Sequence, residues 1–252
     1  IYSAALEKGY TAASIINDAP VVFDSPELDN VWRPENYSGK FFGPTRLRVA
    51  LTHSRNLVSI RLLRDIGAKY VIQYAKRFGF DTSQMPANLS LALGSGSAAP
   101  WDMARAYSSL ANGGYRVEPY IIQRIEDADG VILMQSQPIT VCETCVVPDE
   151  GTEVVDTELQ STLPAKRIMT PQNNTIMNSL LRDVVRYGTG RKAMRLGRKD
   201  LAGKTGTTND QVDAWFNGFH PELVAIAWVG FDSPKTLGRY ETGGRAALPM
   251  WI

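Results

Sequence analysis

A lysine, a glycine and two threonines lie together in the stretch LAGKTGTTND, at positions 204–207. A Gly-Lys-Thr sequence can hold a phosphate in a nucleotide-binding loop, and a Lys-Thr-Gly sequence can form one wall of an acyl-transfer site. The phosphate motif needs a glycine at position 198, which is Arg198 here, and it must lead into a helix. The residues that follow, QVDAWFNGF, favour a strand, so the sequence argues against a phosphate loop.

The acyl-transfer interpretation places the same residues on the edge of a sheet. Side chains alternate along a strand, so Lys204 and Gly206 would face one side and Thr205 and Thr207 the other. Gly206 leaves room for a substrate beside the backbone, and the Thr207 amide can donate to a developing oxyanion. Lys204 supplies a positive charge that can lower a neighbouring pKa or steer a carboxylate. Taken alone, the motif fits an ordinary polar strand end equally well.

A second polar group, Ser54-Arg55-Asn56, separates two stretches with helical patterns. Ser54 can cap the second helix. It can instead relay a proton, while the Asn56 amide both donates to and accepts from a peptide backbone. Ser-x-Asn followed along the chain by Lys-Thr-Gly is the order found in a known set of serine acyltransferase motifs. That order favours the acyl-transfer interpretation of both groups.

The elements that must position these residues are predicted from periodicity and from Pro and Gly signals. Helical patterns cover residues 45–67, 69–79, 99–114 and 170–190, and a hairpin with Asp129-Gly130 in its turn covers 120–135. Residues 214–219 and 223–231 favour two antiparallel strands, and the polar segment 142–167 favours a long surface loop. The sequence therefore predicts a mixed α/β (α+β) domain with an antiparallel sheet.

Length and composition set limits on the class of protein. The chain has 252 residues, 44% hydrophobic and 21% charged, which suits one large or two small globular domains. A net charge of +1 gives no electrostatic reason to expect nucleic acid as a partner. The apolar run VAIAWVGF is far shorter than the roughly 20 residues of a membrane span. No signal peptide opens the chain, and both ends are abrupt, so we expect a fragment of a longer protein.

The two cysteines, Cys142 and Cys145, form a Cys-x-x-Cys pair that suits a redox site, half of a zinc site or a local disulfide. A zinc site needs four ligands, and only His53, expected in a helix, and His220, expected in a turn, supply imidazole. We therefore expect no metal. An oxidising compartment would make a small structural disulfide the best interpretation.

With these motifs in place, the chain resembles the transpeptidase domain of class A, bifunctional penicillin-binding proteins. The matching stretches are IYSAALEKGYTAASIINDAP, VWRPENYSGKFFGPTRLRVALTHSRNLVSIRLL, SLALGSGSAAPWDMARAYSSLANGGYRVEPYII, VVRYGTGRKA, LAGKTGTTNDQVDAWFNGF and ETGGRAALPMWI. The resemblance covers most of residues 1–252 outside the loop. It implies a penicillin-binding protein and β-lactamase-like fold, with an antiparallel central sheet packed between helices, and no cofactor.

The resemblance also implies an activity. Members of this family cross-link peptidoglycan stem peptides through a serine acyl-enzyme, and β-lactam antibiotics trap that serine. Ser54 and Lys204 carry over as catalytic residues, and Asn56, Thr205, Gly206 and Thr207 carry over as substrate-binding residues. Gly188-Thr189-Gly190 would line the same cleft.

The family's first motif, Ser-x-x-Lys, is absent, because no serine of the chain has a lysine three positions later. The resemblance implies that this motif falls just before Ile1, together with strands of the sheet, and that a further helix follows Ile252. We therefore expect the chain alone to be poorly soluble and to form no covalent adduct with a penicillin. The alternative is a non-catalytic binding or sensor module of the same fold. A β-lactamase is disfavoured because no Glu-x-x-x-Asn loop is present.

The resemblance finally implies a place in the cell. Class A proteins act at the periplasmic face of the bacterial inner membrane, held by an anchor that would lie outside this chain. They carry a glycosyltransferase domain and associate with other cell-wall synthesis proteins, and D-Ala-D-Ala carboxypeptidase activity belongs to the same chemistry.

Overall fold

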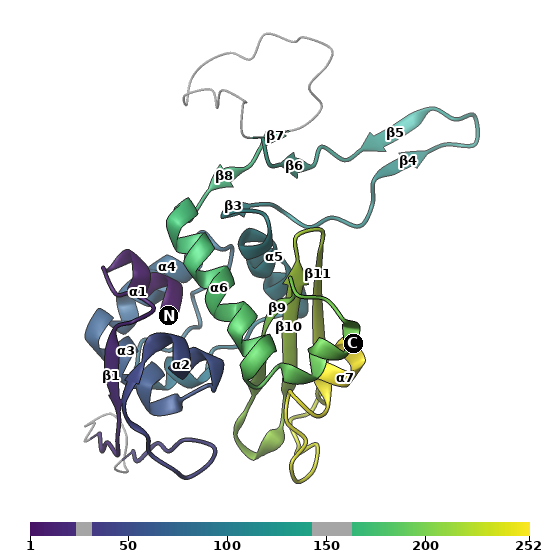
Figure 1. Cartoon of the computed structure of the whole chain (residues 1–252). Coiled ribbons are helices and arrows are strands. Elements are labelled where there is room, and N and C mark those ends of the chain that lie inside the picture. Colours follow the sequence, from purple (N-terminus) through teal and green to yellow (C-terminus); the bar gives the residue numbers. More distant parts are fainter. Residues whose placement is uncertain (24–31, 143–162) are drawn as a thin grey trace.

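A computed structural model describes residues 1–23, 32–142 and 163–252. The N-terminal part is mostly helical and lies on one side of helix α6, while a small sheet lies on the other side (Figure 1). The N-terminal elements are α1 (Tyr2–Glu7), β1 (Ile15–Asp18), β2 (Gly43–Arg46), α2 (Leu47–Thr52), α3 (Asn56–Ile66), α4 (Ala68–Arg77) and the short 3₁₀ helix η1 (Leu89–Leu93). Strands β1 and β2 pair antiparallel.

The C-terminal part is built on an antiparallel sheet in the order β11-β10-β9. Its elements are α5 (Pro100–Ala111), α6 (Pro171–Tyr187), η2 (Arg191–Leu196), β9 (Ala202–Thr207), β10 (Ala214–His220), β11 (Leu223–Val229) and α7 (Ala247–Trp251). The register pairs Lys204 with Asn217 and Gly206 with Trp215. Strand β9 is the outer strand, so one of its edges has no strand partner among the described residues.

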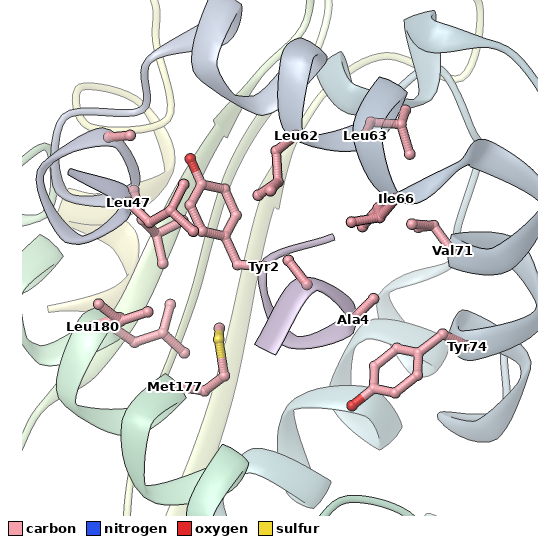
Figure 2. Packing of buried hydrophobic residues seen from close by; sticks show 14 of the residues in the cluster. Tyr2, Ala4, Leu47, Leu62, Leu63, Ile66, Val71, Tyr74, Met177 and Leu180 are labelled. Carbon is pink, nitrogen blue, oxygen red and sulfur yellow. The ribbon is translucent and has the colours of Figure 1, made fainter. Parts of the chain in front are cut away.

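The larger hydrophobic core joins the helices around α1. Figure 2 shows the Tyr2 ring among side chains of α2, α3 and α6, with Ala4 beneath it. Leu47, Leu62 and Leu180 in this core are each at most 1% exposed. Because α1 carries mostly small residues on its buried face, the surrounding helices can approach it closely.

The sheet is covered on both faces. Phe216 points to one face, where its ring forms a T-shaped contact with Trp251 of α7 at a centroid distance of 4.9 Å. Phe219 points to the other face, where it meets Tyr107 of α5 at 6.2 Å. This alternation is what a strand requires when both of its faces are buried. The predicted antiparallel sheet between helices is confirmed.

Several local expectations are confirmed as well. Thr170 caps α6, because its hydroxyl accepts a hydrogen bond from the Asn173 amide at 3.2 Å, and Pro171 opens the helix. The predicted hairpin forms from β4 (Arg124–Glu126) and β5 (Ile132–Gln135) and projects away from the sheet and the helices (Figure 1). Its turn includes the expected Asp129-Gly130 pair.

The break expected at Ser54-Arg55-Asn56 is confirmed, since α2 ends at Thr52 and α3 begins at Asn56. The expectation for the end of the long loop needs correction. Residues 163–167, expected at the end of a loop, form the two-residue strands β7 (Leu163–Pro164) and β8 (Lys166–Arg167). β7 pairs with β6 (Ile139–Thr140), and β8 pairs with β3 (Tyr115–Arg116). Pairing with these strands makes the segment extended although its sequence has no strand pattern. Residues 143–162 of that loop lie outside the described part of the chain.

Cys142 is disulfide-bonded, as the sequence predicted, and Cys145 lies outside the described residues. None of the helices in the described part is both long enough and apolar enough to cross a membrane.

Candidate functional site

The two predicted motifs meet at the free edge of the sheet. The Lys204 ammonium donates to the Ser54 hydroxyl oxygen at 2.9 Å, across a sequence separation of 150 residues. Ser54 occupies the corner between α2 and α3 with a φ of 53°, the left-handed region that costs a residue with a side chain about 1–3 kcal/mol. It does not cap α3, whose N-cap is Arg55 with no side-chain capping bond. The corner instead presents the Ser54 hydroxyl to the sheet.

Lys204 is held in place by a second hydrogen bond. Its ammonium also donates to the carbonyl oxygen of Thr205 at 2.8 Å. The lysine is half-buried, and loss of water around the ammonium lowers the pKa of Lys204 from 10.5 to about 8. Near neutral pH the amine therefore stays mostly charged but gives up a proton much more readily than an exposed lysine.

Two threonines form a pair of hydroxyls beside this lysine. The side-chain oxygens of Thr189 and Thr205 lie 2.6 Å apart, within hydrogen-bonding distance. Thr189 follows Gly188, where a Cβ would overlap the carbonyl oxygen of Thr52. A glycine is therefore needed for the end of α6 to approach α2 this closely. Of the predicted residues 188–190, Thr189 lines the cleft.

Asn56 and Thr207 take part in separate hydrogen bonds at the same site. The Asn56 side-chain amide donates to the Glu35 carbonyl oxygen at 2.9 Å, which leaves its own carbonyl oxygen and one N–H for a ligand. The Thr207 hydroxyl accepts from the Gly243 amide at 3.0 Å. The loop before α7 is thereby attached to the end of β9.

A cleft of about 750 Å³ brings most of these residues together. Its walls include Ser54, Asn56, Thr189, Thr205 and Thr207. Lys204 and Gly206 are not among its lining residues, and Gly206 lines a neighbouring hollow of about 590 Å³ together with Trp215 and Trp228. Lys204 contributes through its contact with Ser54.

Sequence reasoning missed four charged residues that line the cleft: Glu35, Lys192, Asp210 and Arg245. Within the described part of the chain, none of the four forms an ion pair. No motif marks them, since each stands in a loop or short helix without a periodic pattern. Asp210 has a φ of 55° in the turn η3 (Asn209–Gln211), a left-handed conformation that Asp adopts more readily than most residues.

The described residues contain no cluster of three or more His, Cys, Asp or Glu side chains that could hold a metal ion. His53 lies at the end of α2 and lines the cleft, and burial together with the nearby Arg55 lowers its pKa. His220 is the last residue of β10 rather than part of a turn, and its Nδ1 accepts from the Glu222 amide at 3.3 Å. The two imidazoles thus lie in separate surroundings.

Comparison with known proteins identifies the family. Residues 1–243 match the model of the penicillin binding protein transpeptidase domain. All of the chain aligns with penicillin-binding protein 1A of Pseudomonas aeruginosa at 48% identity, covering 34% of that protein. It aligns equally fully with the Neisseria meningitidis protein of the same name at 46% identity, covering 29%. The chain thus spans about a third of the length of the curated relatives it matches.

Comparison with solved structures supports the same family. Penicillin-binding protein 1A from Haemophilus influenzae superposes with a TM-score of 0.88 at 36% identity, over 99% of this chain and 39% of that one. The PonA1 protein from Mycobacterium tuberculosis, solved in complex with penicillin V, has a TM-score of 0.75. At 22% identity, over 99% of this chain and 64% of that one, it supports the fold alone.

The sequence match, the shared fold and the two motifs meeting at one sheet edge agree with one another. The chain belongs to the penicillin-binding protein transpeptidase family, as a transpeptidase domain of the class A type.

Proposed function

We propose that this chain is the greater part of a serine D,D-transpeptidase domain that cross-links peptidoglycan stem peptides through an acyl-enzyme and is blocked by β-lactams. The observation that carries the proposal is the 2.9 Å contact between Lys204 and Ser54. It joins the second and third motifs of a serine acyltransferase into one hydrogen-bonded unit, beside an open cleft.

In the proposed reaction, Ser54 moves a proton. Lys204 donates to the Ser54 oxygen, so the Ser54 hydroxyl proton is free to point into the cleft. When the scissile amide bond breaks, Ser54 passes that proton to the leaving D-alanine nitrogen and receives one from Lys204. On attack, the lysine of the first motif, outside these residues, takes the proton of the nucleophile. It returns that proton to Lys204 once Lys204 has given up its own, so the relay is balanced over one acylation.

The free edge of β9 and the Asn56 amide bind the peptide. An extended stem peptide can pair with that edge as an added strand, and the Asn56 carbonyl oxygen and N–H can bond its backbone. The Thr207 amide is the proposed donor to the oxyanion, a contribution of about 10²–10³ in rate for one such donor. Thr205, and Gly206 through its lack of a side chain, shape the strand for this contact.

The nucleophile itself is supplied from outside these 252 residues, because no Ser-x-x-Lys occurs among them. We propose that it belongs to a longer class A protein that also has a glycosyltransferase domain and a membrane anchor. Such a protein acts at the periplasmic face of the inner membrane, beside other cell-wall synthesis proteins. PonA1, a fold relative, binds penicillin V, which supports the β-lactam part of the proposal.

A labelling experiment tests the function. The full-length protein is mixed with a fluorescent penicillin, and the rate of covalent labelling is compared with that of the Ser54→Ala and Lys204→Ala variants. We expect both variants to slow labelling by about 10²–10⁴-fold, the usual contribution of a proton-transfer group. The exposed residues Ser233 and Lys235, each replaced by alanine, serve as matched controls.

Two outcomes would overturn the proposal. One is a full-length protein that binds stem peptides reversibly but is never labelled, which would instead support the binding module. The other is a stoichiometric acyl adduct on the isolated 252-residue chain, for which we expect none.

A further inference from the structure

A buried polar pair lies behind the Ser54-x-Asn56 corner. Asp18, at the end of β1, is 0% exposed, and Asn36 is 4% exposed. The Asn36 side-chain amide donates to the Asp18 carboxylate at 2.8 Å and to the Lys40 carbonyl oxygen at 2.9 Å. Both amide protons of Asn36 are therefore used, and the segment between residues 36 and 40 is closed into a fixed loop.

The same asparagine reaches the helix that carries Asn56. Its side-chain oxygen accepts from the Leu57 amide, in the first turn of α3, at 3.4 Å. Its neighbour in the chain, Glu35, supplies the carbonyl oxygen that accepts from the Asn56 side chain at 2.9 Å. One residue thus links the buried strand β1, the start of α3 and the carbonyl group that orients the Asn56 amide.

Stability alone does not account for this pair. Among the described residues, no group hydrogen-bonds to the buried Oδ2 of Asp18 or to the buried Nε of Arg55 nearby. Leaving such atoms unsatisfied costs free energy that an apolar pair of the same volume would not cost. A role in fixing the geometry of neighbouring groups would explain why the pair is polar despite that cost.

We infer that Asn36, held by Asp18, is the positioning residue that orients the Asn56 amide toward the cleft. This inference rests on the proposed function, because it assigns Asn36 a role in presenting Asn56 to the stem peptide. With one N–H bonded to Glu35, the remaining N–H and the carbonyl oxygen of Asn56 are directed to a ligand. Without the fixed loop, the amide can rotate and lose this orientation.

The test measures acylation of the full-length protein by a chromogenic β-lactam. We expect Asn36→Ala to slow acylation by about 10–100-fold, the effect of a misplacement of about 1 Å. In an Asn56→Ala background the same substitution should have no further effect, because Asn36 acts through Asn56. The reciprocal swap, Asp18→Asn with Asn36→Asp, keeps one amide–carboxylate bond but loses the donation to the Lys40 carbonyl oxygen, so it should recover only part of the rate lost in Asn36→Ala.

A matched control is Asn174→Ala. Asn174 is 7% exposed and donates to the carbonyl oxygens of Ser109 and Leu110, away from the cleft. It should lower the melting temperature as Asn36→Ala does, but leave acylation unchanged below that temperature. A loss of acylation equal to that of Asn36→Ala would show a general effect of unfolding and overturn the inference.

Two other results would overturn the inference: unchanged acylation in Asn36→Ala, or an equally large loss in the Asn56→Ala background. A failure of the proposed function is distinguishable, since the unsubstituted full-length protein would then form no adduct at all. In that case a crystal structure of the full-length Asn36→Ala variant decides. Asn56 displaced from the Glu35 carbonyl oxygen supports the positioning role, and Asn56 unmoved overturns it.

Discussion

The lowered pKa of Lys204 leads to a quantitative prediction about pH. Burial brings the pKa of Lys204 from 10.5 to about 8. With a pKa of about 8, the ammonium fraction falls from about 90% at pH 7 to about 10% at pH 9, whereas an ordinary lysine would stay above about 95% charged. In the proposed relay the ammonium donates to Ser54, so acylation should slow by roughly tenfold between these pH values.

The assay is stopped-flow acylation of the full-length protein by a chromogenic β-lactam from pH 6 to 10. Lys204→Arg is the matched variant, because a guanidinium keeps its charge over the whole range. We expect its profile to be flat where the unsubstituted protein loses activity, although its overall rate is lower. Two results would refute the assignment to Lys204. One is an acylation rate that falls only near pH 10.5, and the other is an equal fall near pH 8 in Lys204→Arg.

The same shift affects stability. Between about pH 8 and 10.5 the unfolded chain binds more protons at this lysine than the folded chain does, so the free energy of unfolding rises with pH in that window. Tyr2, Tyr74 and Tyr107 act oppositely above pH 10, because burial raises their pKa values to about 12. The difference in free energy of unfolding between the unsubstituted protein and Lys204→Met, measured across this pH range, isolates the contribution of the lysine. A difference that does not change with pH would contradict this sign.

Three substitutions test the packing that supports the site. Gly188→Ala places a Cβ against the Thr52 carbonyl oxygen and should destabilise the fold by about 1–3 kcal/mol, measured by urea unfolding. Thr170→Ala removes the cap of α6 and should cost about 1 kcal/mol. Phe216→Ala empties the space beside Trp251 and should cost about 3–5 kcal/mol, seen as a lower melting temperature.

Controls for these variants come from the same chain. Gly96→Ala meets only ordinary contacts of 3.6 Å, and Thr175→Ala removes an exposed hydroxyl from the same helix. Both should change stability by less than about 0.5 kcal/mol. If Gly96→Ala costs as much as Gly188→Ala, close approach is not the reason for the glycine.

The sequence was most informative where a pattern repeats or a motif has fixed spacing. A proline in the first turn and a glycine after the last turn located α6, and the aromatic and β-branched runs located β10 and β11. The order of Ser54-x-Asn56 and Lys204-Thr205-Gly206 predicted that two distant segments meet, and the contact at 2.9 Å confirms it. A motif is predictive here because the chemistry requires particular residue types at a fixed spacing.

Other parts of the site depend on contacts that only folding creates. Asn36 stands in a loop with no periodic pattern, and the role proposed for it rests on hydrogen bonds to Asp18 and Leu57. The polar residues Thr52–Asn56 indicated the break between α2 and α3, but they did not indicate the backbone conformation inside it. Ser54 has a left-handed backbone there, which local propensity does not favour. Tertiary packing decides such positions, so a single sequence carries no signal for them.

The contact between Ser54 and Lys204 depends on how the helical part docks on the sheet. Ser54 is fixed from the helical side, where its own amide bonds the Leu51 carbonyl oxygen at 3.1 Å, and Lys204 is fixed from the strand β9. Helix α6 contacts both α2 and β9, so it sets the spacing between these two rigid elements. A change in the packing of α6 should therefore alter the site without changing either Ser54 or Lys204. The strain at Ser54 can persist because elements on both sides hold the corner in place.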